Sequence, residues 1–99
     1  MRNIVLLCNA GLSTSMLVDR MKKEAAAMGY ECEINAYPVA EVHEVGPAAD
    51  IILLGPQVRY QADKVRESVS CPVEAIAPAD YGRMDGKKVV LHVKGILGD

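Results

Sequence analysis

A cysteine stands where a short apolar segment meets a glycine-containing, hydroxyl-rich turn. The apolar run covers residues 4–7, Cys8 follows it, and the turn reads Asn9-Ala10-Gly11-Leu12-Ser13-Thr14-Ser15. The first amides of a helix lack intrahelical acceptors, and the helix dipole adds about half a positive charge at that end. Such an end favours the thiolate form of a cysteine, which is the nucleophilic form. A phosphoryl group on the sulfur would accept hydrogen bonds from the same amides. The segment therefore predicts a cysteine that handles phosphate.

The other residues of the turn have both a structural and a functional reading. Gly11 allows a tight turn, and the same freedom permits close approach of the backbone to a phosphate. Ser13, Thr14 and Ser15 can cap a helix and can also donate hydroxyl hydrogen bonds to a phosphoryl group. Capping and phosphate binding are compatible, so both roles are expected.

The remaining cysteines have no such context. Cys32 and Cys71 complete a set of three, which forms no even disulfide framework, no CxxC pair and no zinc-ligand spacing. We expect both to be packing or surface thiols, and we expect neither a metal nor a cofactor.

Composition sets the broad class. A chain of 99 residues with 51% hydrophobic content fits one domain, residues 1–99. The net charge is −2 and charges of both signs are mixed along the chain, so nucleic-acid binding is not expected. The run at residues 4–7 is far shorter than the roughly 20 residues that a membrane span needs, and it lacks the features of a signal peptide. We therefore expect a cytoplasmic protein that does not insert into a membrane.

Strand and helix patterns alternate along the chain. Apolar runs predict strands at residues 3–8, 31–37, 50–54 and 73–76, with the second strand towards the sheet edge. Apolar spacing predicts helices at residues 13–28, 40–45, 59–69 and 84–97. Gly29 and the pair Gly46-Pro47 are expected to end the first two helices, and residues 78–83 to form a loop or short helical turn. The inward positions of the first and last helices are Leu17, Met21, Ala25, Met28, Val89, Val90, Val93, Ile96 and Leu97.

This alternation predicts an α/β fold with right-handed crossovers. We expect a four-stranded parallel sheet in the order 2-1-3-4 with helices on both faces. Ligands of such sheets bind at the carboxyl ends of the strands, where the strand order reverses. Cys8 and Gly55 both follow strands at that edge, so we expect them to meet there.

The chain resembles a known family over essentially its whole length. Residues 8–15 are similar to the phosphocysteine loop of enzyme IIB of the bacterial phosphoenolpyruvate-dependent sugar phosphotransferase system, of the lactose/cellobiose (chitobiose) type. The resemblance extends to Leu53-Leu54-Gly55-Pro56-Gln57 followed by Tyr60, and to Tyr81-Gly82 followed by Asp85-Gly86. It implies a fold like that of low-molecular-weight tyrosine phosphatase.

The resemblance also implies a relay. Cys8 would accept phosphate from a phosphohistidine of enzyme IIA and pass it to a sugar held by the membrane enzyme IIC, which would recruit the protein to the membrane. The sugar would be of the cellobiose, chitobiose, lactose or β-glucoside class. Asn9, Ala10, Gly11, Leu12, Ser13, Thr14 and Ser15 would form the phosphate-binding loop. Gln57, Tyr60 and Tyr81 are candidates for its rim, although Gln57 and Tyr60 could be solvated and Tyr81 could be a core-edge ring with its hydroxyl in water.

Two other functions compete with the carrier. Low-molecular-weight tyrosine phosphatases and related arsenate reductases have a C-x5-R-S loop, whose arginine binds the transferring phosphoryl oxygens. In this chain Thr14 stands at the arginine position, so hydrolysis would lack a major source of transition-state stabilisation. Asp80 could imitate the phosphatase general acid, but a surface aspartate is the favoured reading. A redox sensor would need a resolving cysteine near Cys8, which neither Cys32 nor Cys71 is expected to supply.

Overall fold

A central parallel sheet organises the molecule. The computed structural model describes residues 1–9 and 12–99, together with the side chains of all of these except 12 and 13. The strands are β1 (Arg2–Cys8), β2 (Cys32–Pro38), β3 (Ile51–Leu54) and β4 (Val73–Ala75). They are parallel and run in the order β2-β1-β3-β4. The predicted sheet order and the edge position of the second strand are confirmed.

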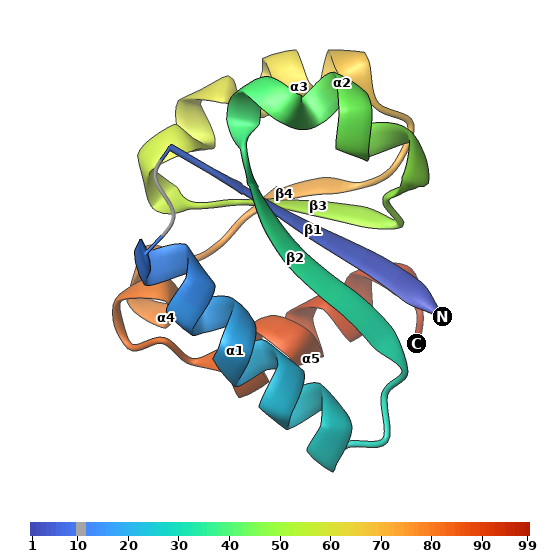
Figure 1. Ribbon diagram of the computed structural model, residues 1–99, viewed down its shortest axis with the longest axis vertical. Helices are drawn as coiled ribbons and strands as arrows, with labels where there is room; N and C mark the ends of the chain where they lie inside the picture. The colour runs from blue at the N-terminus through green and yellow to red at the C-terminus, as the bar shows by residue number, and fades with distance from the viewer. Residues whose placement is uncertain (10–11) are drawn as a thin grey trace.

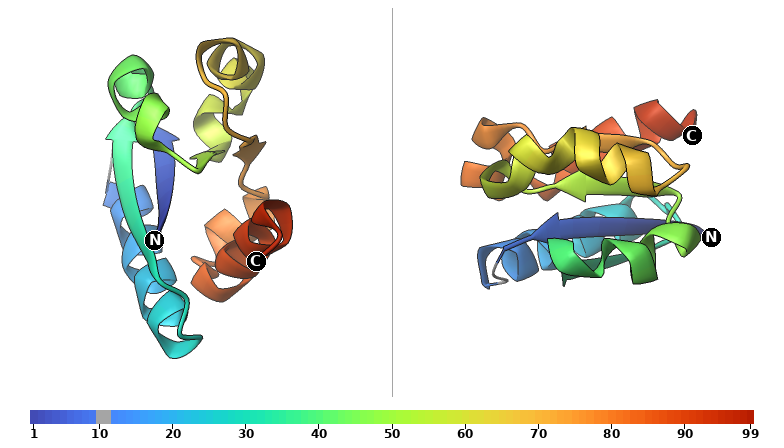
Figure 2. Two further views of the ribbon diagram at one scale, coloured as in Figure 1. Left: turned by 90° about the vertical axis from the view of Figure 1, so that its right-hand side faces the viewer. Right: turned by 90° about the horizontal axis from the view of Figure 1, so that it is seen from above.

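Helices cover both faces of this sheet (Figures 1 and 2). One face carries α1 (Leu12–Ala27), α4 (Pro78–Gly82) and α5 (Gly86–Leu97). The opposite face carries α2 (Val42–Val45), α3 (Ala62–Ser68) and the 3-10 turns η1 (Val39–Glu41), η2 (Gly46–Ala48) and η3 (Pro56–Gln61). Within residues 1–9 and 12–99, no helix combines the length and apolarity that crossing a membrane requires.

The strand alternation splits the core into two layers. Ile4 and Leu6 pack towards α1 and α5, whereas Val5 and Leu7 pack towards α2 and α3. This division follows from the period of two along a strand. The inward positions predicted on α1 and α5 are buried or, for Met28, Ile96 and Leu97, partly buried against the same layer.

Two predicted helices differ in detail from the structure. The α-helix α2 ends at Val45, directly before Gly46-Pro47 as predicted, and the chain then continues through the pair as the 3-10 turn η2. Proline fits there because the first turn of a helix has no intrahelical acceptor for its missing amide hydrogen. The helix expected at residues 59–69 begins earlier as η3 and becomes α-helical only at Ala62, and Val69 is extended. The short helical turn expected at residues 78–83 is present as α4.

Candidate functional site

Cys8 is the last residue of β1, at the carboxyl edge of the sheet, and only 4% of its surface is exposed. Its thiol donates a long hydrogen bond, 3.8 Å, to the backbone carbonyl of Tyr37. Tyr37 lies on β2 opposite Leu7, so the parallel register brings this carbonyl beside the sulfur. The contact requires a proton on sulfur, since a carbonyl oxygen can only accept.

Gly55 forms the neighbouring wall of the site. Its amide donates to the carbonyl of Leu7 at 3.0 Å, which extends the β1–β3 pairing by one residue. A Cβ atom at this position would lie 3.9 Å from the Cβ of Cys8 and 3.2 Å from Oε1 of Gln57. Cys8 and Gly55 therefore meet where the sheet topology predicts.

The chain then turns from β1 into α1. Asn9 is exposed in a bend, and Ala10 and Gly11 lie outside the described residues. The backbone of Leu12 and Ser13 opens α1. Ser15 is exposed on the first turn of this helix. Four elements thus gather at one edge of the sheet, at the left of Figure 1: the end of β1, the start of α1, the turn after β3, and α4.

Thr14 and Tyr81 join two of these elements. The Thr14 Oγ1 atom lies 3.0 Å from the Tyr81 hydroxyl oxygen, within hydrogen-bond distance, and either group can donate. Thr14 is 1% exposed and Tyr81 is 8% exposed. The alternative in which the Tyr81 hydroxyl lies in water is therefore wrong. The pair fixes the first turn of α1 to α4.

The other two rim candidates differ in their surroundings. Gln57 is exposed in η3, but its side-chain oxygen approaches Gly55 and hence the wall beside Cys8. Tyr60 is 76% exposed, and its hydroxyl accepts a hydrogen bond from the side chain of its neighbour Gln61. Only Gln57 of these two has a described contact next to the cysteine.

The remaining cysteines lie away from Cys8. Cys32 begins β2 opposite Arg2, at the far end of β1 and about 20 Å from Cys8. Cys71 precedes β4, also at the amino edge of the sheet. Both are free thiols whose pKa is raised by burial. This arrangement disfavours the redox-sensor reading, since neither cysteine is placed to resolve an oxidised Cys8.

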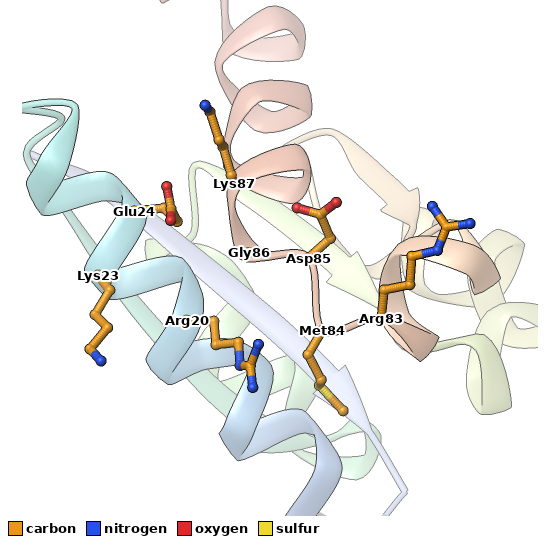
Figure 3. A pocket seen from close by; sticks show the side chains of 8 residues that line it. All are labelled: Arg20, Lys23, Glu24, Arg83, Met84, Asp85, Gly86 and Lys87. Atoms are coloured by element: carbon orange, nitrogen blue, oxygen red, sulfur yellow. The ribbon is translucent and has the colours of Figure 1, made fainter.

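A hollow of about 450 Å³ lies between α1 and the turn that joins α4 to α5 (Figure 3). Its described lining comprises Arg20, Lys23, Glu24, Arg83, Met84, Asp85, Gly86 and Lys87, and does not include Cys8 or Gly55. The cationic end groups lie at separate corners, while the Glu24 and Asp85 carboxylates stand on either side of the hollow. Because its positive groups do not converge, we do not assign it to phosphate.

The fold and the site together define a class: a parallel α/β domain in which a cysteine ends β1 and a short turn leads from it to the first helix. The family model "PTS system, Lactose/Cellobiose specific IIB subunit" matches residues 3–92. The chain belongs to this family of sugar-specific IIB components of the phosphotransferase system, as its sequence resemblance indicates.

Relatives and solved structures agree. The chain is 37% identical over 102 residues to the galactose-specific EIIB component of Lactococcus lactis subsp. cremoris, covering 95% of this chain and 94% of that one. It is 38% identical over 91 residues to the oligo-beta-mannoside-specific EIIB component of Bacillus subtilis, covering 89% and 88%. The solution structure of a cellobiose-specific IIB component from Borrelia burgdorferi matches with a TM-score of 0.81 at 36% identity, covering 98% and 92%. A lactose-specific IIB domain from Streptococcus pneumoniae shares the fold, with a TM-score of 0.84 at 17% identity over 96% of both chains.

Two features of the site escaped sequence reasoning. The Tyr37 carbonyl could have been found from the strand order, because the carboxyl end of β2 must lie beside that of β1. The contact between Thr14 and Tyr81 has no linear signal, since 67 positions separate the two residues.

Proposed function

We propose that this protein is a phosphoryl carrier in which Cys8 accepts phosphate from a phosphohistidine of enzyme IIA and delivers it to a sugar held by the membrane enzyme IIC. The observation that carries the proposal is the location of Cys8 at the carboxyl end of β1, four positions before Leu12, where α1 begins. Unpaired amides and the helix dipole at such an end stabilise an added dianion. Membership of the sugar-specific IIB family supports the same role.

The first transfer begins with removal of the proton that the Cys8 thiol directs at the Tyr37 carbonyl. The sulfur then attacks phosphorus, the S–P bond forms, and the P–N bond of the donor breaks. The imidazole nitrogen keeps the electron pair and can take up a proton. The backbone amides of residues 9–14 would surround the phosphoryl oxygens, with hydroxyl donors from Ser13, Thr14 and Ser15.

The second transfer reverses the role of the sulfur. A sugar hydroxyl oxygen attacks phosphorus, the S–P bond breaks, and the sulfur leaves with its electron pair, while the hydroxyl proton passes to the leaving thiolate or to solvent. The sugar would belong to the cellobiose, chitobiose, lactose or β-glucoside class. Relatives carry names for galactose, cellobiose and oligo-beta-mannoside, so the choice is expected to reside in enzyme IIC. The carrier would work in the cytoplasm and reach the membrane through that partner.

The test locates the phosphate. The protein is incubated with phosphorylated enzyme IIA and examined by intact-mass and peptide mass spectrometry. Wild type, Cys32→Ser and Cys71→Ser should each acquire one phosphoryl group on Cys8, whereas Cys8→Ser should fold and acquire none, because a serine hydroxyl has no comparable ionised form at neutral pH. Phosphate on Cys8→Ser, or on another residue of the wild type, would refute the assignment.

A further inference from the structure

We infer that Tyr81 is a positioning residue for phosphoryl transfer: it holds the Thr14 hydroxyl so that this hydroxyl donates to the phosphoryl group on Cys8. The inference rests on the proposed carrier function. It assigns α4, an element more than 60 positions away in sequence, a role in the chemistry of Cys8.

Burial explains why the contact persists. A polar group that leaves water without a partner loses its hydration with no compensation. The Thr14 and Tyr81 side chains are both buried, and each hydroxyl finds the other at 3.0 Å. The Thr14 oxygen thus makes a contact that crosses from α1 to α4.

The backbone anchors the Tyr81 end of the pair. The Tyr81 amide donates to the Ala77 carbonyl at 3.0 Å, and its carbonyl accepts from the Met84 amide at 3.1 Å. The ring belongs to the core layer beneath α1 and α5. The hydroxyl of Tyr81 is therefore a fixed point, and the Thr14 hydroxyl adjusts to it.

The two hydroxyl groups can each donate one hydrogen bond and accept others, which allows the pair to act on a phosphoryl group. Each hydroxyl has one proton and can also accept. When Tyr81 donates to Thr14, the Thr14 proton is released for another acceptor, and the two bonds polarise each other. A phosphoryl dianion at the start of α1 selects this direction. Thr14 then serves as a neutral, oriented donor at the position where the phosphatase loop has a charged arginine.

The experiment compares four single variants of the full chain and the double variant Thr14→Val with Tyr81→Phe. Tyr81→Phe removes only the hydroxyl, Thr14→Val removes the donor at constant shape, and Thr14→Ser retains it. Tyr30→Phe is the matched control, because the Tyr30 hydroxyl also has a side-chain partner, Asp99 at 2.6 Å, in a different part of the fold. For each protein we would measure kcat and KM for transfer from enzyme IIA, and the pH midpoint of the phosphoryl titration by ³¹P NMR.

Loss of a hydroxyl donor to a dianion should raise the titration midpoint. Thr14→Val should raise the titration midpoint and lower kcat about tenfold. Tyr81→Phe should also raise the midpoint and should lower kcat about threefold. Neither variant should change KM much. The double variant should be no worse than Thr14→Val alone, while Thr14→Ser and Tyr30→Phe should match wild type. If Tyr81→Phe left both the titration midpoint and kcat unchanged, the role of Tyr81 would be refuted. The carrier proposal would stand in that case, because the wild-type protein would still be phosphorylated. A wild-type protein that takes no phosphate would overturn the carrier proposal, and this inference with it.

Discussion

Thr14 is the residue of this site that differs most from a phosphatase loop. Its position is that of the arginine in the phosphatase loop, but its side chain is neutral, buried and directed at Tyr81. Asp80, the residue that could imitate a general acid, instead lies 3.8 Å from the Lys88 ammonium in a salt bridge. Under the proposed function, the site would bind a dianion without the arginine that accelerates hydrolysis in the phosphatases. A carrier gains from this, because its phosphocysteine must survive until the acceptor arrives.

We therefore predict negligible hydrolysis of aryl phosphates. The wild-type rate with p-nitrophenyl phosphate should not exceed that of Cys8→Ser, measured by release of nitrophenolate. A known low-molecular-weight phosphatase in the same assay is the positive control. Phosphatase-like turnover that Cys8→Ser abolishes would favour the hydrolase over the carrier.

At the scale of elements, one glycine sets the distance between the two long helices that support the site. Gly86 opens α5 against the backbone of α1, and a Cβ at this position would lie 2.6 Å from the Arg20 carbonyl carbon and 2.7 Å from the Met21 amide nitrogen. Asp85 caps the same helix by accepting from the Lys88 amide at 3.1 Å. The close approach needs a residue without a side chain, because backbone atoms cannot move aside as a flexible side chain can.

The two glycines of α5 provide a matched pair of variants. Gly86→Ala should destabilise the protein by about 1–3 kcal/mol, because α1 and α5 must separate. Gly95→Ala should stabilise it by about 0.5–1 kcal/mol, because Gly95 is exposed in the helix and its Cβ would meet no described atom within 4 Å beyond the neighbouring backbone of its own helix. Urea denaturation gives both values. Equal effects of the two substitutions would contradict this account of the helix contact.

At the scale of the whole molecule, a polar cluster joins the first strand to the end of the last helix, where Figure 1 shows the two termini close together. The Arg2 guanidinium donates two hydrogen bonds of 2.9 Å to the Asp99 carboxylate, which also accepts from the Tyr30 hydroxyl at 2.6 Å. Hydrogen bonds from Arg2 and then Tyr30 lower the pKa of Asp99 to about 2. Burial, followed by the hydrogen bond to Asp99, raises the pKa of Tyr30 to about 12. The cluster lies at the opposite edge of the sheet from Cys8.

These shifts predict the pH range over which the cluster stabilises the fold. The lowered pKa of Asp99 means that its contribution is present above about pH 4 and is lost as the pH falls towards 2. The raised pKa of Tyr30 means that its contribution is present below about pH 10 and is lost as the pH rises towards 12.

Absorbance of tyrosinate tests the alkaline limb directly. The difference in tyrosinate absorbance between wild type and Tyr30→Phe reports the ionisation of Tyr30, and its midpoint should lie near pH 12. Asp99→Asn should move that midpoint towards 10. Far-UV circular dichroism at each pH checks that the protein remains folded. A Tyr30 midpoint near 10 in the folded wild type would contradict the assigned cluster.

The layout of this protein could be predicted from its hydrophobic pattern. Buried strands and amphipathic helices alternate with clear apolar periods, so the sheet order, the inward helix positions and the approach of Gly55 to Cys8 could all be predicted. These features depend on local hydrophobic patterns and on the handedness of crossovers, which short segments already encode. The motifs also pointed correctly to the IIB family.

The contacts between distant elements could not be predicted in this way. The partner of Thr14 is Tyr81, on a helix whose position depends on the packing of the whole layer beneath α1 and α5. The continuation of the chain through Gly46-Pro47 as η2 likewise depends on its surroundings, since Gly46 is buried and a Cβ there would meet the Val42 and Val69 side chains. Local sequence gives the preference of each segment, but contacts between distant side chains form only when the packed core has fixed the helices in place.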